Sequence, residues 1–361
     1  MLKANFIKKF TDFKLDISLE VAESELLVIL GKSGCGKSTL LNCLAGFIRP
    51  DVGSFDMAGK CYNQTENNFM LAIHKRHIAY IQQGNTLFPH LSVGENILYS
   101  VRKKKRALWA DKYEALLDLL DINMLMNRSV ETLSGGQKQR VIIARALMMD
   151  PGLVLWDEPF TALDHQLREE LSNLVLALKK QLKIPMIFVT HDLEEAFKMA
   201  DSLAVMHEGH ILQLDDKSRI FNHPCSERVA QTLGIKNRLY VRCMDERKAL
   251  FEHTASGHTF EVRNTKEYLN QDYGHEQVLG IRPESITLIP SIKDGTKTNT
   301  FSVTLMSKEE KLNYYQLTIK LKGIKDLFIM HLPKDHVEDM VDIGEKMSVY
   351  IKAKDMMIFE K

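Results

Sequence analysis

The first two thirds of the chain show two alternating patterns of hydrophobic positions. Mostly apolar segments predict buried strands, and four of them stand out: Leu26–Leu30, His77–Gln82, Leu153–Trp156 and Met186–Thr190. Leucines spaced three and four residues apart predict one apolar helix face at Leu167, Leu171, Leu174, Leu178 and Leu182. Strands that alternate with helices predict a parallel sheet covered on both faces, which is an α/β fold.

Two segments depart from this alternation. Residues 90–130 lack strand signals and show helical spacing at Tyr113, Leu116, Leu117 and Leu120, which predicts a helical subdomain over about residues 90–150. Further on, apolar residues come in short strand-like runs such as Leu317–Leu321, separated by turn formers. We therefore expect two domains, 1–235 and a mostly β domain over 239–361, with a linker at Asn222–Pro224. The second domain is expected to be a small barrel.

Composition narrows the class of protein. The 361 residues are 45% hydrophobic and 26% charged, with a net charge of +1, so no global basic field attracts nucleic acid or membrane. No apolar run approaches the ~20 residues of a membrane-spanning helix, and the N-terminus lacks the pattern of a signal peptide. Five cysteines without a C-x-x-C pair argue against a disulfide framework or a zinc site. We expect a cytosolic chain.

A glycine-rich segment carries the first chemical signal. It fits G-x-x-x-x-G-K-[ST] and consists of Gly31, Lys32, Ser33, Gly34, Cys35, Gly36, Lys37 and Ser38. The glycines let backbone N–H groups turn toward phosphate oxygens, Lys37 can reach the β- and γ-phosphates, and the Ser38 hydroxyl can ligate Mg²⁺. A glycine turn that binds nothing is the alternative. The position between a buried strand and a helix favours a phosphate loop, because the helix N-terminus adds its positive end.

A second signal is the acidic pair that ends the strand Leu153–Trp156. Asp157 and Glu158 follow this strand directly, and the carboxyl ends of parallel strands are the usual place for ligands in an open α/β sheet. Alone, such a pair is more often a helix cap or a solvated turn. Together with a phosphate loop, it predicts that Asp157 holds Mg²⁺ and that Glu158 polarises the water that attacks the γ-phosphate.

A third signal lies between these two. Ser134, Gly135, Gly136 and Gln137 precede a segment with an apolar helix face, so Ser134 can cap that helix and the free N–H groups can bind an anion. The simpler interpretation is an ordinary N-cap with a glycine turn. Since one ATP rarely needs two phosphate clamps from a single chain, we expect two copies of the chain to sandwich each nucleotide.

Over about residues 1–230 the chain resembles the ATP-binding subunit of an ATP-binding-cassette (ABC) transporter. The motifs of that family occur in its order: Walker A (Gly31 to Thr39), the glutamine loop (Ile81 to His90), the signature (Ser134 to Gln137), Walker B (Leu153 to Asp157) with Glu158, the D-loop (Ala162 to Asp164) and the switch histidine (His191). Six such motifs in one order are specific, although each alone is weak. The resemblance implies a P-loop NTPase fold that binds ATP and Mg²⁺ and hydrolyses ATP.

The resemblance also implies roles for individual residues. Lys37, Ser38 and Thr39 would bind phosphates and Mg²⁺, and Gln83 would complete the metal shell and sense the transporter, with Gln82 as the alternative. Glu158 would be the base, and His191 would contact the γ-phosphate. The nucleotide-binding set would be completed by the remaining loop residues, the signature and Asp164. An aromatic ring should stack on the adenine, either Phe10 or Phe13.

The second domain indicates the branch of the family. Residues 279–284 read L-G-I-R-P-E, which closely resembles the signature of the oligonucleotide-fold (TOBE) domains on importer ATPases for sugars, polyamines, ferric iron and sulfate or molybdate. Arg282 and Glu284 could also be a simple surface ion pair beside a turn proline. The segments His74–Tyr80, Leu87–Val93 and Asn96–Tyr99 look most like the molybdate and sulfate branch.

This resemblance implies partners and a location. We expect a homodimer at the cytoplasmic face of the cell membrane, bound to permease subunits and served indirectly by an extracytoplasmic solute-binding protein, without nucleic acid. The alternatives are a ferric-iron or polyamine importer ATPase, or a nucleotide-gated regulatory clamp outside transport. The basic run Arg102–Arg106 could be a solvated face or a contact with anionic lipid headgroups.

Overall fold

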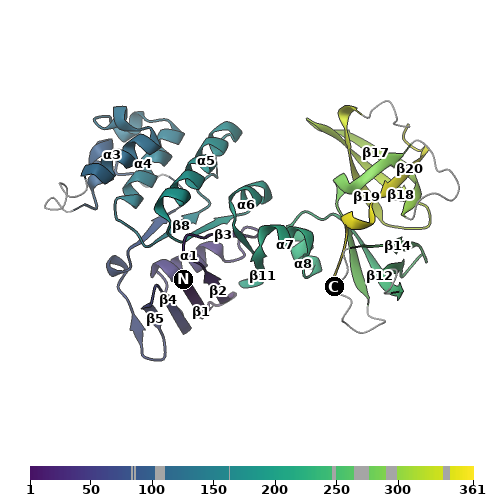
Figure 1. Cartoon of the computed structure of the whole chain (residues 1–361), viewed down its shortest axis with the longest axis horizontal. Helices are drawn as coiled ribbons and strands as arrows, with labels where there is room; N and C mark the ends of the chain where they lie inside the picture. Colours follow the sequence, from purple (N-terminus) through teal and green to yellow (C-terminus); the bar gives the residue numbers. More distant parts are fainter. Residues whose placement is uncertain are drawn as a thin grey trace. The chain divides into compact units, whose positions relative to one another are not determined.

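The structure is a computed structural model that describes residues 1–82, 84, 87–101, 110–161, 163–245, 249–263, 276–289, 299–335 and 342–361. The chain divides into two compact units, 1–217 and 218–361 (Figure 1). The division therefore falls before the boundary that we expected near residue 235, and the expected linker Asn222–Pro224 lies inside the second unit. Ala230 and Ile235 pack with Val278, Met357 and Phe359 of that unit, which explains the earlier division.

The first unit is built on a sheet of eleven described strands in the order β6-β5-β4-β1-β2-β11-β10-β3-β9-β8-β7. Its parallel part contains β3 (Leu26–Leu30), β7 (Ile78–Ile81), β8 (Leu153–Asp157), β9 (Met186–Thr190) and β10 (Ser202–His207). All residues of β3, β8 and β9 are buried, as expected for strands covered on both faces. The predicted α/β architecture is confirmed.

A mainly antiparallel part extends the same sheet, with a parallel contact between its strands β11 and β2. It consists of β1 (Leu2–Lys9), β2 (Lys14–Val21), β4 (Val52–Met57), β5 (Lys60–Gln64), β6 (Phe69–Met70) and β11 (His210–Asp216). β1 and β2 alternate between buried and exposed side chains, as half-buried strands do.

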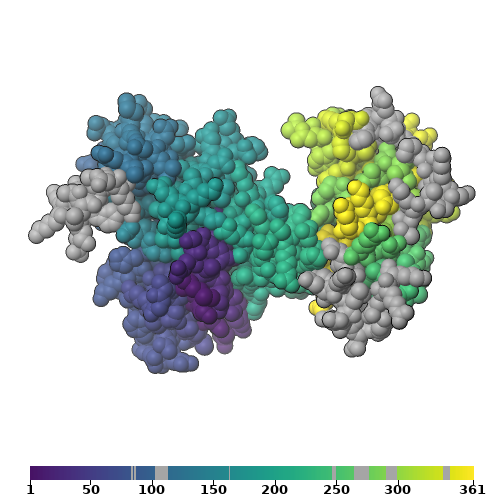
Figure 2. Space-filling model, viewed as in Figure 1, coloured from purple at the N-terminus to yellow at the C-terminus, as the bar shows by residue number. Residues whose placement is uncertain are grey.

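Helices cover this sheet and form the predicted insertion. They are α1 (Lys37–Ala45), α2 (Val93–Leu98), α3 (Ala110–Leu120), α4 (Gly135–Leu147), α5 (His165–Leu182) and α6 (Leu193–Met199). α2 and α3 both pack against α4, and Figure 2 shows this helical segment as a lobe apart from the antiparallel strands. Within the described ranges, no helix combines the length and the apolar character needed to cross a lipid bilayer.

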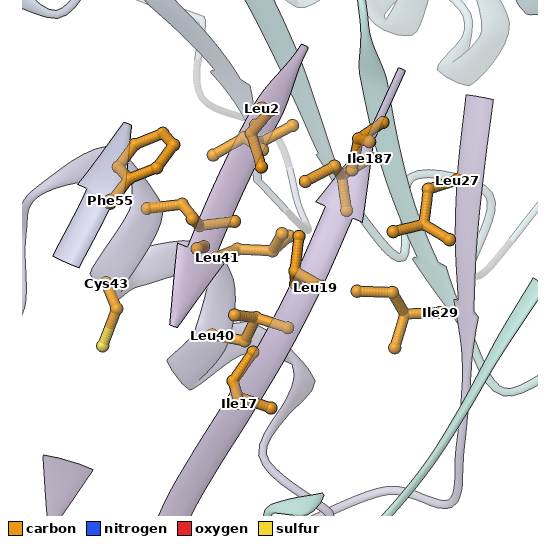
Figure 3. Close-up of a cluster of buried hydrophobic side chains, with 14 of the residues drawn as sticks. Leu2, Ile17, Leu19, Leu27, Ile29, Leu40, Leu41, Cys43, Phe55 and Ile187 are labelled. Atoms are coloured by element: carbon orange, nitrogen blue, oxygen red, sulfur yellow. The ribbon is translucent and has the colours of Figure 1, made fainter. Parts of the chain in front are cut away.

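The core of the first unit lies between α1 and the sheet. Leu40 and Leu41 of α1 are fully buried and lie near Ile17 and Leu19 of β2 (Figure 3). Because α1 begins directly at the end of the glycine-rich loop, this packing fixes the position of that loop on the sheet.

The second unit opens with two short helices, α7 (Lys217–Asn222) and α8 (Glu227–Thr232), and continues with two five-stranded antiparallel sheets. One sheet has the order β14-β13-β12-β15-β21: β12 (Asn237–Asp245), β13 (Leu250–His253), β14 (Thr259–Glu261), β15 (Gln277–Ile281) and β21 (Met356–Phe359). The other has the order β16-β20-β17-β18-β19: β16 (Ile286–Ile289), β17 (Thr300–Glu310), β18 (Tyr314–Leu321), β19 (Leu327–Pro333) and β20 (Lys346–Ile351). Both sheets contribute to one hydrophobic core. The expected mostly β, oligonucleotide-fold-like domain is confirmed.

Candidate functional site

The glycine-rich loop joins β3 to α1 in a conformation that needs its glycines. Gly34 and Gly36 have φ angles of 82° and 105°, in the left-handed region that favours glycine. A Cβ atom at Gly36 would lie 2.5 Å from Cζ of Phe13, and one at Gly31 would lie 2.6 Å from the carbonyl oxygen of Met206. Gly34 has open space around it, so the tip of the loop is accessible while its base is tightly packed.

Lys37 begins α1, and its side chain turns back into this loop. The side chain is only 4% exposed, and Nζ donates hydrogen bonds to the carbonyl oxygens of Gly31 (2.8 Å) and Lys32 (3.2 Å). The same ammonium lies 3.3 Å from Oε1 of Glu158. A buried cation that is shared between loop carbonyls and one carboxylate can exchange these partners for phosphate oxygens.

The other loop residues differ in exposure. Lys32 and Ser33 are exposed at the tip, and Thr39 is half-buried in the first turn of α1. Cys35 is buried, and burial raises the pKa of its thiol. Its backbone N–H donates to the carbonyl oxygen of Lys32, which closes the turn of the loop.

Asp157 ends β8 and is held by two hydroxyl groups. Oγ of Ser38 donates to Oδ1 at 2.9 Å, and the hydroxyl of Tyr80 donates to Oδ2 at 2.8 Å. Burial, and next the nearby carboxylate, raise the pKa of Tyr80, so this hydroxyl stays protonated and can donate. Sequence reasoning missed Tyr80. Its signal was a tyrosine one position before the end of β7, the strand that pairs with β8.

Glu158 follows Asp157 and has a backbone φ of 44°, an uncommon conformation for a residue other than glycine. Its Oε2 lies 2.9 Å from Nδ1 of His191 and accepts a hydrogen bond from Oγ1 of Thr161 at 3.3 Å. Burial raises the pKa of Glu158, but Lys37 and His191 outweigh it and hold the pKa below its usual value. The carboxylate is therefore ionised at neutral pH.

The signature residues form a helix cap. Ser134 is the N-cap of α4, its Oγ accepts from the N–H of Gln137 (3.3 Å), and the Gln137 side chain accepts from the N–H of Ser134 (3.1 Å). Gly135 has open space around it, whereas a Cβ at Gly136 would collide with the side chain of Leu167. In the described part of the chain, neither Ser134 nor Gln137 hydrogen-bonds to the phosphate loop.

Asp164 has a local structural role. It is the N-cap of α5, and its Oδ1 accepts a hydrogen bond from the N–H of Leu167 at 2.9 Å. Since Leu167 also packs against Gly136, the D-loop and the signature are neighbours in the fold.

Two aromatic rings lie near the loop. Phe10 is 42% exposed, and its ring centroid is 6.0 Å from that of Phe13. Phe13 packs under Gly36 and Gly209, so it supports the phosphate loop, while Phe10 offers the more accessible face. Gln83, Ala162 and the basic run Arg102–Arg106 lie outside the described residues, and Gln82 is exposed just beyond β7.

The parallel sheet and the phosphate loop define the class of P-loop nucleotide-binding proteins. A family model described as "ABC transporter" matches residues 15–161. A molybdate/tungstate import ATP-binding protein of Pyrococcus horikoshii is 36% identical over 331 residues, which are 90% of each chain. A spermidine/putrescine import ATP-binding protein of Borreliella afzelii is 33% identical over 350 residues, which are 96% of this chain and 93% of that one.

Another relative is also an import ATP-binding protein, and two solved structures also belong to ABC transport systems. A sulfate/thiosulfate import ATP-binding protein of Pectobacterium atrosepticum is 36% identical over 70% of this chain and 77% of its own. The ADP form of an ABC-transporter cassette aligns with a TM-score of 0.55 at 27% identity, over 65% of this chain and 98% of its own. A protein of Clostridium perfringens described as part of an ABC transporter complex aligns with a TM-score of 0.54 at 28% identity, over 61% of this chain and 90% of its own.

The chain therefore belongs to the ABC transporter family, in the group of ATP-binding proteins. This confirms the family that the motifs predicted, and it makes the chain a nucleotide-binding protein.

Proposed function

We propose that the protein is the ATP-hydrolysing, energy-coupling subunit of an import system and that two copies close on two ATP molecules. The observation that carries this proposal is the convergence of Lys37, Asp157, Glu158 and His191 at the carboxyl edge of the parallel sheet. An ammonium, a metal-type carboxylate, a second ionised carboxylate and an imidazole at one place are the groups that phosphoryl transfer to water needs.

The residues present fit ATP and Mg²⁺. Lys37 and the N–H groups of the loop would bind the phosphates, helped by the N-terminus of α1. Ser38 and Asp157 supply oxygen atoms, and Mg²⁺ in such sites takes one or two protein oxygens together with substrate phosphates. When bound, Mg²⁺ supplies positive charge that neutralises the phosphate oxygens. Gln83 remains a proposed further ligand, and Phe10 the proposed adenine contact.

Glu158 is the proposed general base. It is ionised at neutral pH, and its contacts with His191 and Thr161 orient the carboxylate to accept a proton from the attacking water. Phosphate oxygens would compete with Glu158 for the ammonium of Lys37. Nucleotide binding would thus free one oxygen of Glu158 for the water, and His191 would contact the γ-phosphate.

The signature would act on the nucleotide of the partner copy. Ser134 starts a helix of 13 residues, and the open space at Gly135 lets an anion approach its N-terminus. Asp164, beside the signature, would contribute to the same interface. This arrangement requires a dimer, because each nucleotide would use the loop of one copy and the signature of the other.

A surface pocket of about 190 Å³ supports the proposed contact with a membrane permease. It lies between the end of β7 and the helical segment, and Tyr80, Phe88, Tyr99, Arg145 and Met149 line it. Tyr99 and Met149 are 63% and 46% exposed, so this pocket offers accessible apolar side chains to a partner. The protein would then work at the cytoplasmic face of the membrane, with a solute-binding protein as an indirect partner.

Inorganic oxyanions, molybdate or sulfate, are the proposed solutes. The relatives include import proteins for molybdate/tungstate, for sulfate/thiosulfate and for spermidine/putrescine, so a polyamine importer is one alternative. A ferric-iron importer, which the resemblance of the second domain implies, is the other. The test compares uptake of radiolabelled molybdate, sulfate, spermidine and ferric iron in cells with the intact gene and with Lys37→Ala. Loss of oxyanion uptake alone supports the proposal, and loss of polyamine or iron uptake alone replaces it.

The second unit is proposed to pair with its twin and to control hydrolysis. If the protein were a nucleotide-gated clamp outside transport, it would hydrolyse ATP, but cells with Lys37→Ala would lose none of these uptake activities. The test measures ATPase activity of the full chain and of residues 1–217, titrated with molybdate and sulfate in the presence of the permease. Inhibition confined to the full chain supports control by the second unit, and identical titrations of both proteins contradict it.

A further inference from the structure

A pocket of about 390 Å³ opens in the second unit between β16 and β19. This volume lies within the ~300–1,000 Å³ of typical small-molecule sites. Its walls are mainly apolar side chains from these two strands, and Tyr314 of β18 and Glu284 beside β16 complete the rim. We call it the seam pocket. None of its residues belongs to the proposed nucleotide site.

The seam pocket exists because one sheet curls without closing. β16 and β19 are the two edges of the same five-stranded sheet, and their Cα atoms approach within 8 Å without forming a ladder. An added strand would need about 9.6 Å between its neighbours, twice the usual strand spacing of ~4.8 Å. The opening therefore suits a small molecule and not an inserted peptide strand.

A buried asparagine limits this opening at one end. Asn237 of β12 accepts a hydrogen bond from the N–H of Ile329 at 2.6 Å and donates one to its carbonyl oxygen at 2.8 Å. These bonds cover the edge of β19 at Ile329. In an antiparallel strand, the backbone N–H and C=O groups of every second residue point to the same side. His331 lies two residues after Ile329, so its backbone groups also point to this edge and face the seam.

His331 lines the seam pocket and carries an unsatisfied polar atom. Its Nε2 is buried and has no hydrogen-bond partner among the described residues. Its ring lies 4.2 Å from that of Tyr314, and burial lowers its pKa, so the imidazole is neutral at pH 7. A buried nitrogen without a partner is costly, and a polar ligand in this pocket can supply the missing hydrogen bond.

Glu284 gives the seam pocket its charge. It is the one formally charged side chain among the lining residues, and it forms no ion pair within the described part of the chain. The surface ion pair that Arg282 could have provided is not formed. Arg282 instead donates to the carbonyl oxygens of Phe221 (2.8 Å) and Leu233 (3.2 Å), and its guanidinium lies 3.6 Å from the centroid of the Phe221 ring. Lys236 acts on His331 electrostatically but does not line the pocket.

We propose that the seam pocket binds a small organic cation, a protonated amine with an apolar body. The carboxylate of Glu284 would accept hydrogen bonds from the ammonium, and the face of Tyr314 would add a cation–π contact. The apolar walls would cover the body of the ligand. This binding site goes beyond the proposed ATPase function, because it uses none of the groups that act on ATP.

The test measures where such probes bind and which charge they need. Full-length protein with ¹³C-labelled methionine methyl groups is titrated with phenethylamine, benzylamine and hexylamine, each alongside its matched alcohol and carboxylate. We expect the amines to shift the methyl signal of Met330, which lines the pocket. The signal of Met347, in the same core but outside the lining, should stay in place. Equal shifts by alcohols or carboxylates, or no shift by any amine at millimolar concentration, would overturn the proposal.

Variants separate the site from general effects on the domain. Glu284→Gln should weaken amine binding about fivefold, as expected for an exposed charge contact, and leave alcohol binding unchanged. Thr287→Phe, at an exposed position of β16, should fill the pocket and abolish binding. Glu310→Gln, which removes an exposed carboxylate paired with Lys334, is the matched control and should bind amines normally. Unchanged amine affinity in folded Glu284→Gln would also overturn the proposal.

Discussion

The nucleotide site of the first unit and the seam pocket of the second unit hold their polar and charged side chains in opposite ways. At the sheet edge of the first unit, Lys37, Glu158 and His191 contact one another. In the seam pocket of the second unit, Glu284 has no ion pair and Nε2 of His331 has no hydrogen bond within the described residues. A ligand of the first unit must therefore exchange existing contacts, whereas a ligand of the second unit adds missing ones. The first arrangement suits turnover, and the second suits simple binding.

The strongest test of the first arrangement is Glu158→Gln. The amide keeps the shape of the side chain but cannot accept the proton of the attacking water, so we expect ATP turnover to fall by about 10²–10⁴-fold while ATP binding persists. The measurement is steady-state ATPase activity together with ATP-dependent dimerisation by light scattering. Glu169→Gln, which removes an exposed carboxylate paired with Lys198, should hydrolyse ATP normally. Wild-type turnover in Glu158→Gln would show that another group is the base.

Lys37→Ala removes the ammonium that would exchange its protein partners for phosphate oxygens. Because this ammonium is buried and would form charge-assisted hydrogen bonds to phosphate, we expect ATP affinity to fall about 30-fold. Equilibrium binding of a fluorescent ATP analogue measures the change. Lys3→Ala, which breaks an exposed pair with Glu20, should bind like the parent chain. Comparable affinity in Lys37→Ala would mean that the loop binds phosphate through its backbone alone.

Tyr80→Phe tests the hydroxyl that orients Asp157. Phenylalanine keeps the ring but leaves Oδ2 of Asp157 without this donor, and lost orientation of a metal ligand typically costs 10–100-fold in metal affinity. We expect the Mg²⁺ concentration for half-maximal ATPase activity to rise about tenfold, with little change in the rate at saturating Mg²⁺. Tyr240→Phe alters an exposed tyrosine outside this site and serves as the control. An unchanged Mg²⁺ dependence would leave Tyr80 with a packing role only.

The smallest expected effect is a difference between the two units in how much folding stability each loses at acidic pH. Burial lowers the pKa of His253 and His331, so the unfolded chain takes up protons first and the second unit loses stability as the pH falls below about 6.5. Because the pKa of Glu158 is lowered, its contribution to the stability of the first unit is lost only at more acidic pH. Thermal unfolding at pH 7 and about pH 5.5 should show the difference. Tryptophan fluorescence reports the first unit, which holds both tryptophans, and the Met330 methyl signal reports the second. Equal losses in both units would contradict this prediction.

The sequence predicted the parallel half of the first unit well because its signals are local. The predicted strands Leu26–Leu30 and Met186–Thr190 have the observed bounds, since a strand buried on both faces must be apolar throughout. β4 and β5 were missed because their apolar residues are few and stand among polar ones: β4 buries only Phe55 and Met57. In β5, Asn63 is 2% exposed, and only the pairing of this strand with β4 and β6 places that polar residue inside the sheet.

The proposed catalytic groups could also be named from sequence, but their geometry could not. The motif order pointed to Lys37, Asp157 and Glu158, because the loop and the strand end require particular residue types. Tyr80 carries no such pattern, and its role depends on the pairing of β7 with β8. The seam pocket was equally hidden, because it arises from two sheet edges that are far apart in the sequence.

The left-handed backbone at Glu158 has a consequence for the evolution of this chain. A non-glycine residue in this conformation costs about 1–3 kcal/mol, and a hydrogen bond from its N–H to the carbonyl oxygen of Val189 helps to hold it there. Selection for a stable chain and selection for turnover therefore oppose each other at this position. A library randomised at residue 158 should become enriched in glycine or asparagine when it is sorted for thermal resistance, and in glutamate when it is sorted for growth that depends on the imported solute.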